Sequence, residues 1–366
     1  MNILHVSTAL TWRGGEQQIA YLIEELAQKK NVKQWVLCAK NSSMNRHCIE
    51  KKIAHIAIKK VFSFNLYFAY QLAKTCRKQK IDLIHLHDAH AHNFAVLAAD
   101  IFRNKTKCVL SRRVDFPIRN NWFSHYKYQH DCIKKIICVS QAIEKIVEKT
   151  IGKTEKLTHI HSGIDLGKFQ SKKKINILRT EYQIPKNHFL IGNVAALAAH
   201  KDYITFIDTA KILIEKGVSA TFLMIGEGKE RAFLEKYIKE KKISKHLIMI
   251  GFRNDISQIL PELDVFLFTS KTEGLGTSVI DALAAGVPIA TTNAGGITEI
   301  VSDRKTALVA KVGDSKQLAE SVFELLENEN LRENLAINGR KRAILFAKKN
   351  MAKQTLDIYK RLHITE

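Results

Sequence analysis

The sequence has few of the features that mark secreted or membrane-spanning proteins. It contains four prolines and no run of about 18 apolar residues, the length that a membrane-spanning helix needs. The first ten residues, MNILHVSTAL, lack the basic flank of a secretion signal and predict a strand. The six cysteines show no CxxC spacing, so they favour reduced thiols in a cytosol over a disulfide framework or a zinc site. They are Cys38, Cys48, Cys76, Cys108, Cys132 and Cys138.

Acidic residues are scarce in the first half of the chain. Residues 1–174 carry 31 Lys and Arg against 13 Asp and Glu, a formal charge of +18, whereas residues 175–366 carry 27 against 23, or +4. A basic half indicates an anionic partner, for which nucleic acid, an acidic membrane surface and a phosphorylated glycolipid are candidates. A lysine-rich composition without any partner is the remaining alternative.

Apolar, β-branched runs alternate with stretches of helical periodicity along the chain, which is typical of parallel α/β folds. A break with glycines, a charge run and no periodicity, residues 163–174, predicts a linker. The sequence therefore predicts two Rossmann-like domains with open sheets that face each other across a cleft. The predicted strands are 3–7, 34–39, 83–86, 107–111 and 135–139, then 189–194, 220–225, 247–250, 265–269 and 288–291, and the predicted helices include 16–29, 66–79 and 351–362.

Two glycines, Gly14 and Gly15, stand between the first predicted strand and the helix that follows it. Paired glycines let the backbone approach a ligand, and the helix start offers N–H groups to an anion. The pair lacks the full GxGxxG spacing, so a plain strand-to-helix turn is the alternative.

Residues 271–301, KTEGLGTSVIDALAAGVPIATTNAGGITEIV, carry the strongest chemical signal. Glu273 follows a predicted strand, at the edge where open α/β sheets bind ligands, and can bind sugar hydroxyls there. A helix that begins near Thr277 would present its first amides to a diphosphate. Asp281 lies one helical turn further on the same face, where a carboxylate can accept ribose hydroxyls. The alternative is a glycine turn beside solvent-facing acids.

Lys201 lies in the segment VAALAAHKDYITF, after a predicted strand and at a helix start marked by Asp202. A cation that enters the same crevice would neutralise a leaving diphosphate, usually a large contribution when a phosphate departs. One more surface lysine is the alternative interpretation.

Taken together, these residues resemble glycosyltransferase family 4, whose members are retaining enzymes of the two-domain GT-B fold, over essentially the whole chain. The paired glycines resemble the family's N-terminal glycine motif, HSGIDLGKF at 161–169 its interdomain motif, and 271–301 its nucleotide-sugar motif. The resemblance implies an acceptor-binding domain at residues 1–168 and a nucleotide-sugar-binding domain at 175–349. It also implies that the final helix, about 350–366, packs back on the first domain.

The resemblance assigns roles residue by residue. Glu273 would bind hydroxyls of the donor sugar and Lys201 its phosphates, which makes these two the candidate catalytic residues. Asp281 would bind the ribose. The donor-binding candidates are Gly14, Gly15, Gly226, Arg253, Gly274, Leu275, Gly276, Thr277 and Asp281.

Three positions depart from the family's pattern. Asp281 replaces a glutamate that is one methylene longer, which predicts weaker or water-bridged ribose binding. Ala196 replaces an arginine that assists the leaving group, so Arg253 or Arg13 would have to supply that charge. Arg113 stands at about the place where the family commonly has a histidine near the reacting carbon.

The segment HLHDAHAH, residues 85–92, gathers His85, His87, His90 and His92 around Asp88 and suggests zinc. Family members commonly have an HxH at this strand end without a metal, so the resemblance implies no metal and no cofactor besides the nucleotide-sugar substrate. We expect some of these histidines to bind backbone. The candidates for acceptor contact are His87, Asp88, Arg113 and Asp115.

The resemblance implies a retaining glycosyltransferase that moves a sugar from a nucleoside diphosphate to a hydroxyl of a membrane-associated saccharide. Lipopolysaccharide or cell-surface glycan synthesis is the expected process, and a small soluble sugar or sugar phosphate is the alternative acceptor. A non-catalytic module that binds nucleic acid or membrane is the alternative from another class, but it leaves the donor-site motifs without a purpose.

The expected partners are a nucleotide-sugar donor, a saccharide or glycolipid acceptor and an anionic membrane surface, with no nucleic acid. The expected location is cytoplasmic, peripheral on the inner face of the cytoplasmic membrane. The side chains considered for lipid contact are basic (Lys51, Lys52, Lys59, Lys60, Lys74, Arg77 and Lys78) or aromatic (Phe62, Phe64 and Trp122).

Overall fold

The computed structural model describes residues 1–59, 65–119, 121–152, 154–169 and 175–364. Lys60, Phe62 and Phe64, which were considered for lipid contact, and linker residues 170–174 lie outside the described residues.

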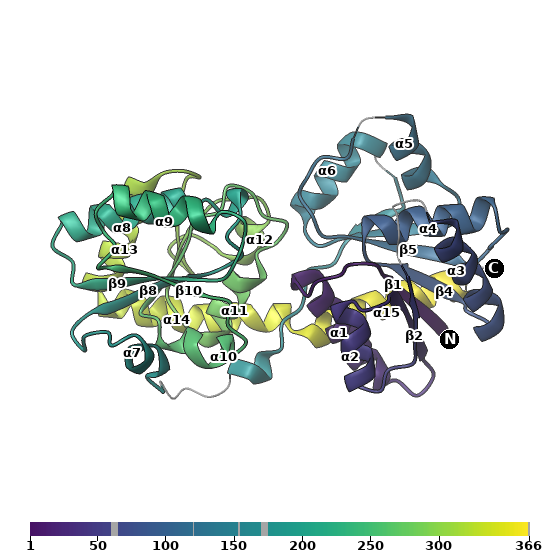
Figure 1. The fold of residues 1–366 in the computed structure, drawn as a ribbon, viewed down its shortest axis with the longest axis horizontal. Helices are drawn as coiled ribbons and strands as arrows, with labels where there is room; N and C mark the ends of the chain where they lie inside the picture. The colour runs from purple at the N-terminus through teal and green to yellow at the C-terminus, as the bar shows by residue number, and fades with distance from the viewer. Residues whose placement is uncertain (60–64, 120, 153, 170–174, 365–366) are drawn as a thin grey trace. The chain divides into compact units, whose positions relative to one another are not determined.

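The chain forms two compact units, and the first takes up both ends of the chain (Figure 1). It consists of Met1–Gly163 and Lys348–Glu366, and the second unit is Ile164–Ala347. The division lies at Gly163 rather than at residue 168, because the N–H of Ile164 donates to the carbonyl of Phe346 within the second unit.

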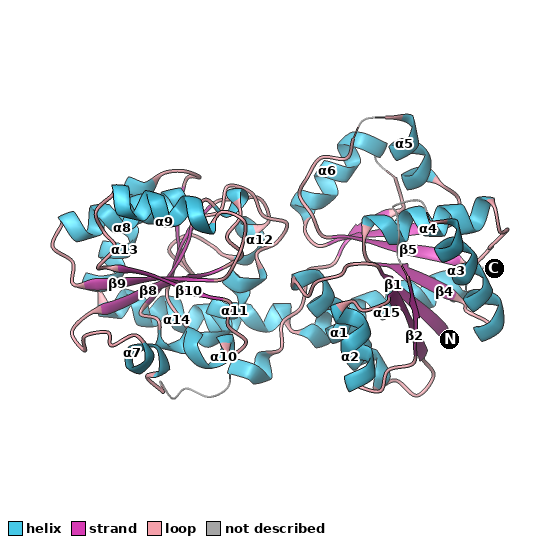
Figure 2. Ribbon diagram, in the orientation of Figure 1, coloured by secondary structure: helices cyan, strands magenta, loops and turns pink. Residues whose placement is uncertain are grey.

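The first unit is built on a seven-stranded parallel sheet with the strand order β3-β2-β1-β4-β5-β6-β7 (Figures 1 and 2). The strands are β1 Asn2–Ser7, β2 Lys33–Ala39, β3 His55–Ile58, β4 Leu83–Leu86, β5 Lys107–Arg112, β6 Ile133–Cys138 and β7 Leu157–His159. The helices are α1 Gly14–Ala27, α2 Ser43–Glu50, α3 Leu66–Gln79, α4 Ala89–Asp100, α5 Trp122–Gln129, α6 Gln141–Ile151 and α15 Lys348–Ile364.

Helices cover both faces of this sheet, as its apolar strands require. On one face, α1 and the C-terminal helix α15 share a core with the sheet, in which Tyr21 and Tyr359 pack with Ile3 and Leu83. On the other face α3 lies beside α4, and the rings of Phe68 and Phe94 stack 4.6 Å apart. The α15 helix is therefore part of the first unit's core.

The second unit has a six-stranded parallel sheet with the order β10-β9-β8-β11-β12-β13 (Figures 1 and 2). The strands are β8 Phe189–Val194, β9 Ala220–Ile225, β10 Leu247–Gly251, β11 Val265–Phe268, β12 Ile289–Thr292 and β13 Leu308–Ala310. The helices are α7 Ile177–Glu181, α8 Tyr203–Glu215, α9 Arg231–Glu240, α10 Ile256–Ile259, α11 Thr277–Ala285, α12 Ile297–Ile300, α13 Ser315–Glu327 and α14 Glu329–Ala343. Short 3₁₀ turns lie at Leu166–Phe169, Ala199–Lys201, Leu260–Glu262 and Ile344–Phe346.

Strand order in the second unit creates one point where the chain changes direction across the sheet. From β8 the chain runs outward through β9 and β10, then returns to place β11 on the other side of β8. In open α/β sheets the ligand-binding crevice lies outside the carboxyl ends of the strands at such a point, which here are the ends of β8 and β11. The ligand-binding position of this unit is therefore set by its topology.

Candidate active site

The loops that follow β8 and β11 meet at the switch point of the second sheet. The N–H of Lys271 donates to the carbonyl of His200 at 2.8 Å, and the hydroxyl of Thr269 donates to the carbonyl of Asp202 at 3.0 Å. The side chain of Lys271 also pairs with Asp202, at 3.3 Å. These contacts hold the two loops in a fixed relation, so their side chains can act together.

Lys201 and Glu273 are brought together by these loops. The Lys201 ammonium donates to Oε1 of Glu273, and the hydroxyl of Ser270 donates to the same oxygen at 2.7 Å. The side chains are 16% and 8% exposed, which leaves this ion pair mostly shielded from solvent. The two residues were predicted to share one crevice from separate motifs, and the structure places them in direct contact.

Two glycines pack directly against the backbone of the Glu273 loop. Gly295 has a φ of +49°, and a Cβ atom there would lie 2.3 Å from the carbonyl oxygen of Glu273. A Cβ atom on Gly296 would lie 2.4 Å from the carbonyl oxygen of Gly274. The N–H of Gly296 donates to the Glu273 carbonyl at 3.0 Å. Only glycine permits this close backbone approach, which holds the Glu273 loop against Gly295 and Gly296.

The loop ends at the N-terminus of α11, which begins at Thr277 as expected. Gly276 is the N-cap with a φ of +89°, and it brings no side chain that would occupy the N–H groups of the first turn. A helix N-terminus carries a partial positive charge and binds anions through such groups. Gly274 and Leu275 lie in the same loop, between Glu273 and this helix start.

Asp281 lies on α11, one turn beyond Thr277, and is partly exposed. Burial raises the pKa of its carboxyl to about 7, and the positive charge of Lys168 opposes this shift. Lys168 belongs to the Leu166–Phe169 turn, inside the HSGIDLGKF segment. The structure thus connects two of the three segments on which the sequence interpretation rested.

Gly226 and Arg253, the other candidates in this unit, have different surroundings. Gly226 follows β9 and has a φ of +151°, and a Cβ atom there would lie 2.0 Å from the carbonyl oxygen of Ala195 in the loop after β8. The Arg253 guanidinium is held by carboxylates, Glu181 at 2.7 Å and Asp255 at 2.6 Å. Its charge is therefore already paired within the unit. That Arg253 stabilises the charge of a departing diphosphate stays a prediction.

In the first unit, Gly14 and Gly15 form the first turn of α1. A Cβ atom on Gly15 would lie 4.0 Å from the Arg113 side chain, so the glycine loop adjoins that arginine. Nothing lies within 4 Å of the corresponding position on Gly14. The paired glycines therefore leave open space beside the half-buried Arg113 guanidinium.

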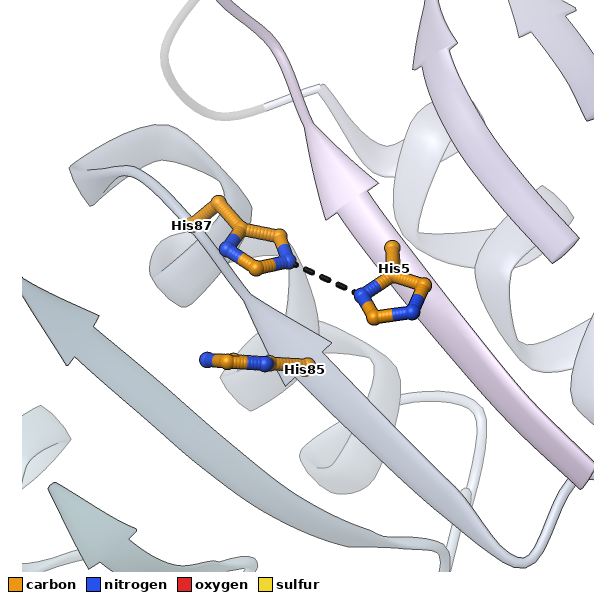
Figure 3. Close-up of side chains that lie close together, drawn as sticks. All are labelled: His5, His85 and His87. Carbon is orange, nitrogen blue, oxygen red and sulfur yellow. Dashed lines mark hydrogen bonds between the residues drawn. The ribbon is translucent and has the colours of Figure 1, made fainter. Parts of the chain in front are cut away.

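His5, His85 and His87 lie together (Figure 3), and His5 comes from β1, far from the histidine-rich segment. Nδ1 of His5 lies 3.1 Å from Nε2 of His87, and Nε2 of His5 lies 3.0 Å from the side-chain oxygen of Gln34. Arg113 donates to the carbonyl of His87 at 3.0 Å and to Nδ1 of the same residue at 3.1 Å. Arg113 and His87, two predicted acceptor residues, are thus in contact.

The hydrogen bonds fix one proton arrangement. Because Arg113 is always a donor, Nδ1 of His87 accepts, its Nε2–H donates to His5, and His5 donates from Nε2 to Gln34. Burial lowers the pKa of His87 and lowers that of His5 to about 4, so these rings are neutral. His85 bonds to the hydroxyls of Tyr359 and Ser111.

A metal ion does not fit this cluster well. Every ring nitrogen of His5, His85 and His87 already has a hydrogen-bond partner, and the Arg113 guanidinium lies against His87. A cation would have to displace these partners beside an existing positive charge. His92 does not join the cluster, since its Nε2 donates to the backbone carbonyl of Lys127 at 2.8 Å.

The two acidic acceptor candidates differ in their surroundings. Asp88 caps α4, and it also accepts from the hydroxyl of Thr8 at 2.7 Å, so it links β1 to α4. Asp115 is partly buried, and its Oδ2 has no hydrogen-bond partner among the described residues. A contact of either residue with an acceptor stays a prediction.

Two sequence-family models match the chain. Glycosyltransferase Family 4 matches residues 12–168, and Glycosyl transferases group 1 matches residues 174–342. Together they cover both units, each of which is a Rossmann-like parallel sheet. The chain therefore belongs to the family 4 glycosyltransferases, enzymes of the GT-B fold.

Individual relatives agree with this assignment. The chain is 27% identical over 313 residues to N,N'-diacetylbacillosaminyl-diphospho-undecaprenol alpha-1,3-N-acetylgalactosaminyltransferase of Campylobacter jejuni, and the match covers 80% of each chain. It is 24% identical to N-acetyl-alpha-D-glucosaminyl L-malate synthase of Bacillus anthracis over 76% of this chain and 74% of that one. The crystal structure of Anabaena Alr3699/HepE in complex with UDP shares the fold, with a TM-score of 0.85 and 18% identity over 99% of this chain and 100% of that one.

Among the described residues, we find no helix with the length and apolar character needed to cross a membrane.

Proposed function

We propose that this glycosyltransferase binds a nucleoside-diphosphate sugar in its second unit and transfers the sugar with retention of anomeric configuration. The observation that carries the proposal is the contact between Lys201 and Glu273 beside the N-terminus of α11. At the switch point, a cation and a helix N-terminus can bind a diphosphate and stabilise the negative charge that develops on it as it departs. The carboxylate beside them can bind sugar hydroxyls.

Lys201 and the first amides of α11 would stabilise the negative charge that develops on the diphosphate as the anomeric C–O bond breaks. Glu273 would accept hydrogen bonds from sugar hydroxyls, and Asp281 from the ribose. The acceptor hydroxyl would attack from the face that the diphosphate leaves and give its proton to a departing phosphate oxygen. The residues of the chain then orient the two substrates and stabilise the departing diphosphate, and neither a protein base nor a metal ion is required.

Binding of UDP, the ligand of the HepE structure, tests the donor site. UDP at 100 times its Kd should stabilise the protein by about 2.7 kcal/mol, seen as a higher Tm. Lys201→Ala should lose most of this shift, whereas Lys211→Ala, on the exposed surface of α8, should keep it. The shift should be the same with EDTA. Equal shifts in both variants would contradict the site, and a shift that EDTA removes would contradict the metal-free proposal.

We further propose that the acceptor is a membrane-associated saccharide in cell-surface glycan synthesis, reached from the cytoplasmic face of the membrane. The Campylobacter relative is named for a lipid-linked acceptor, whereas the Bacillus anthracis relative is named for malate, a soluble one. Exposed side chains on the first unit favour a lipid-linked acceptor.

Large apolar side chains are exposed at α3, at the end of α4 and at α5. These residues, which we call the aromatic surface, are Leu66, Tyr67, Tyr70, Ile101, Trp122 and Tyr126. Tyr70 packs on Phe102, which joins α3 to the end of α4, and Trp122 stacks on Tyr126 within α5. The Tyr126 hydroxyl donates to Asp100, which joins α5 to the end of α4. Trp122 is 77% exposed, and a group of exposed apolar side chains of this kind marks a site of contact with a protein or a membrane.

Basic side chains flank the aromatic surface. Lys74 and Lys78 are exposed on α3, and Arg103 follows Phe102. Each Lys or Arg near an anionic membrane contributes about 1 kcal/mol of attraction. Lys51 and Lys52, by contrast, follow α2, which packs with α1 on the opposite face of the sheet. The basic residues considered from the sequence therefore divide between two faces, and we propose that the α3 group contacts lipid.

Co-sedimentation with vesicles tests this surface. The protein should bind vesicles with 30% phosphatidylglycerol at low salt, and should bind neutral phosphatidylcholine vesicles little. The double variant Lys74→Glu with Lys78→Glu should lose binding, and Lys51→Glu with Lys52→Glu, with the same charge change, should keep most of it. Equal loss in both would leave only net charge as the cause, and no binding at low salt would favour a soluble acceptor.

A further inference from the structure

Two cysteines lie close together, away from the histidine cluster: Cys108 is on β5, and Cys132 immediately precedes the neighbouring strand β6. The N–H of Cys108 donates to the carbonyl of Cys132 at 2.7 Å, and the two thiols are also in hydrogen-bonding contact. Ile133 lies opposite Cys108 in the parallel register, so Cys132 is the diagonal neighbour of Cys108. An interstrand spacing of about 4.7–4.9 Å combined with a rise of about 3.3 Å along the strand gives a Cα separation of about 6 Å, within the range of about 4.4–6.8 Å that a disulfide spans. The backbone therefore already has the spacing that a bond between the two sulfurs needs.

Cys132 also contacts a histidine that is held by a carboxylate. Nδ1 of His130 lies 3.0 Å from Sγ of Cys132, and Nε2 of His130 lies 2.9 Å from Oδ1 of Asp100. The backbone N–H of Cys132 donates to Nδ1 at 3.1 Å, so this nitrogen is an acceptor and the ring proton is on Nε2, facing Asp100. Tyr126 donates to the other oxygen of Asp100 at 3.0 Å. The imidazole is thus oriented as a base toward the sulfur.

The two thiols differ in access and in charge. Cys108 is buried, with 1% of its surface exposed, whereas Cys132 is partly exposed. The hydrogen bond from Cys108 lowers the pKa of the Cys132 thiol to about 7, with further help from His130 and against the effect of burial. The same bond and burial raise the pKa of Cys108. Cys132 is therefore the more accessible of the two residues and the one whose thiol ionises more readily, whereas Cys108 stays a protonated thiol.

We propose that Cys132 is a redox-reactive thiol that peroxide oxidises and that Cys108 resolves into an intramolecular disulfide. Nδ1 of His130 takes the Cys132 thiol proton, and the resulting thiolate attacks one peroxide oxygen. The O–O bond breaks, and the leaving hydroxide takes that proton from Nδ1, which yields a sulfenic acid and water. The sulfur of Cys108 then attacks the sulfur of Cys132. The S–O bond breaks, and hydroxide leaves with the Cys108 proton as a second water.

The chain offers an internal comparison in a second cysteine pair. Cys38 on β2 and Cys48 on α2 are also in thiol–thiol contact, but both are fully buried. Their further partner is the hydroxyl of Ser42 rather than an imidazole. This pair has the proximity of the first without its exposure or its base, so it should stay reduced under the same treatment.

Peptide mapping of the whole, native protein tests the proposal without reference to transferase activity. After treatment with hydrogen peroxide and blocking of remaining thiols, a non-reducing tryptic digest should contain residues 108–112 linked to residues 128–134. The control peptides, 34–40 and 47–51, should carry the blocking group. Absence of the first linkage in oxidised protein, or equal oxidation of both pairs, would overturn the proposal.

Labelling rates separate the role of His130 from simple exposure. Alkylation of Cys132 by iodoacetamide should have a pH midpoint near 7, and His130→Asn should move it toward the ordinary value of about 8.5 and slow labelling at pH 7 about tenfold. Cys108→Ser should leave a sulfenic acid at Cys132 that dimedone traps. An unchanged midpoint in His130→Asn would show that the imidazole does not activate the thiol, and no dimedone adduct in Cys108→Ser would show that peroxide does not oxidise Cys132. Either result would overturn the proposal.

Discussion

The hydroxyl of Tyr359 hydrogen-bonds to Nδ1 of His85, although 274 residues separate them in the sequence. Tyr359 is fully buried on α15, and His85 lies on β4 with its other nitrogen 2.8 Å from the hydroxyl of Ser111. The C-terminal helix therefore supplies a polar partner to the center of the first unit as well as apolar packing.

Removal of that hydroxyl should destabilise the first unit. Tyr359→Phe leaves a buried ring nitrogen without its partner, and we expect a loss of about 1–3 kcal/mol in the free energy of unfolding. All three tryptophans, Trp12, Trp35 and Trp122, lie in the first unit, so their fluorescence during urea unfolding reports on it alone. Tyr237→Phe, which removes a hydroxyl from the second unit, is the control and should leave this transition in place. An unchanged midpoint in Tyr359→Phe would contradict the role of the hydrogen bond.

Lys201 and Glu273 should be needed for turnover. Lys201→Ala and Glu273→Gln remove interactions that strengthen as charge develops on the diphosphate, so each should lower kcat roughly a hundredfold. Circular dichroism should show an intact fold. Lys211→Ala, in an exposed ion pair with Glu215, should have a normal rate. A near-normal rate in either folded variant would remove that residue from the catalytic pair.

Asp281 should affect donor binding more than the chemical step, since a ribose is remote from the bond that breaks. Asp281→Ala is therefore expected to raise the donor's KM by more than it lowers kcat, while Asp281→Glu should be tolerated. Initial rates over a range of donor concentrations measure both constants. Should Asp281→Ala abolish kcat at unchanged donor affinity, the residue would have a catalytic role instead.

The buried histidines should make the first unit sensitive to acid. The pKa of His5 is about 4 in the folded chain because of burial, against an ordinary value near 6.5, so between these values the unfolded chain binds more protons. The contribution to stability is complete above pH 6.5 and is lost as the pH falls through about 4. His5→Gln, whose amide can replace the ring's hydrogen bonds, should flatten this dependence in tryptophan-monitored unfolding. An equal slope in both proteins would assign the acid sensitivity to other groups.

Most of the fold could be predicted from the sequence, because a strand that is buried on both faces of a sheet is a continuous run of apolar residues. Strands 83–86, 189–194 and 220–225 and helix 66–79 have the predicted bounds. Three strands, β3, β7 and β13, were missed, since each has three or four residues and lies at or near the edge of its sheet, where the run is short. Lys201 and Glu273 were predicted to lie in one crevice, and they are in contact because the carboxyl ends of the neighbouring parallel strands β8 and β11 lie at the same edge of the sheet.

Contacts between distant segments could not be predicted from spacing. His5 has no histidine near it in the sequence, and it joins His85 and His87 only because β1 pairs with β4. The partner of His130, Asp100, ends a helix 30 residues earlier. The sequence interpretation regarded all six cysteines as equivalent, since neither the exposure of Cys132 nor the imidazole beside it follows from composition.

The return of α15 to the first sheet has a consequence for synthesis on the ribosome. Residues 164–347 form one unbroken unit, so all of its strands emerge in succession and can pair as they appear. The first unit emerges earlier, yet the face that Met351 and Tyr359 cover stays open until some 184 later residues have been made. A unit that begins translation first is thus completed last, and its exposed apolar face is the part of the nascent chain that a chaperone has to shield.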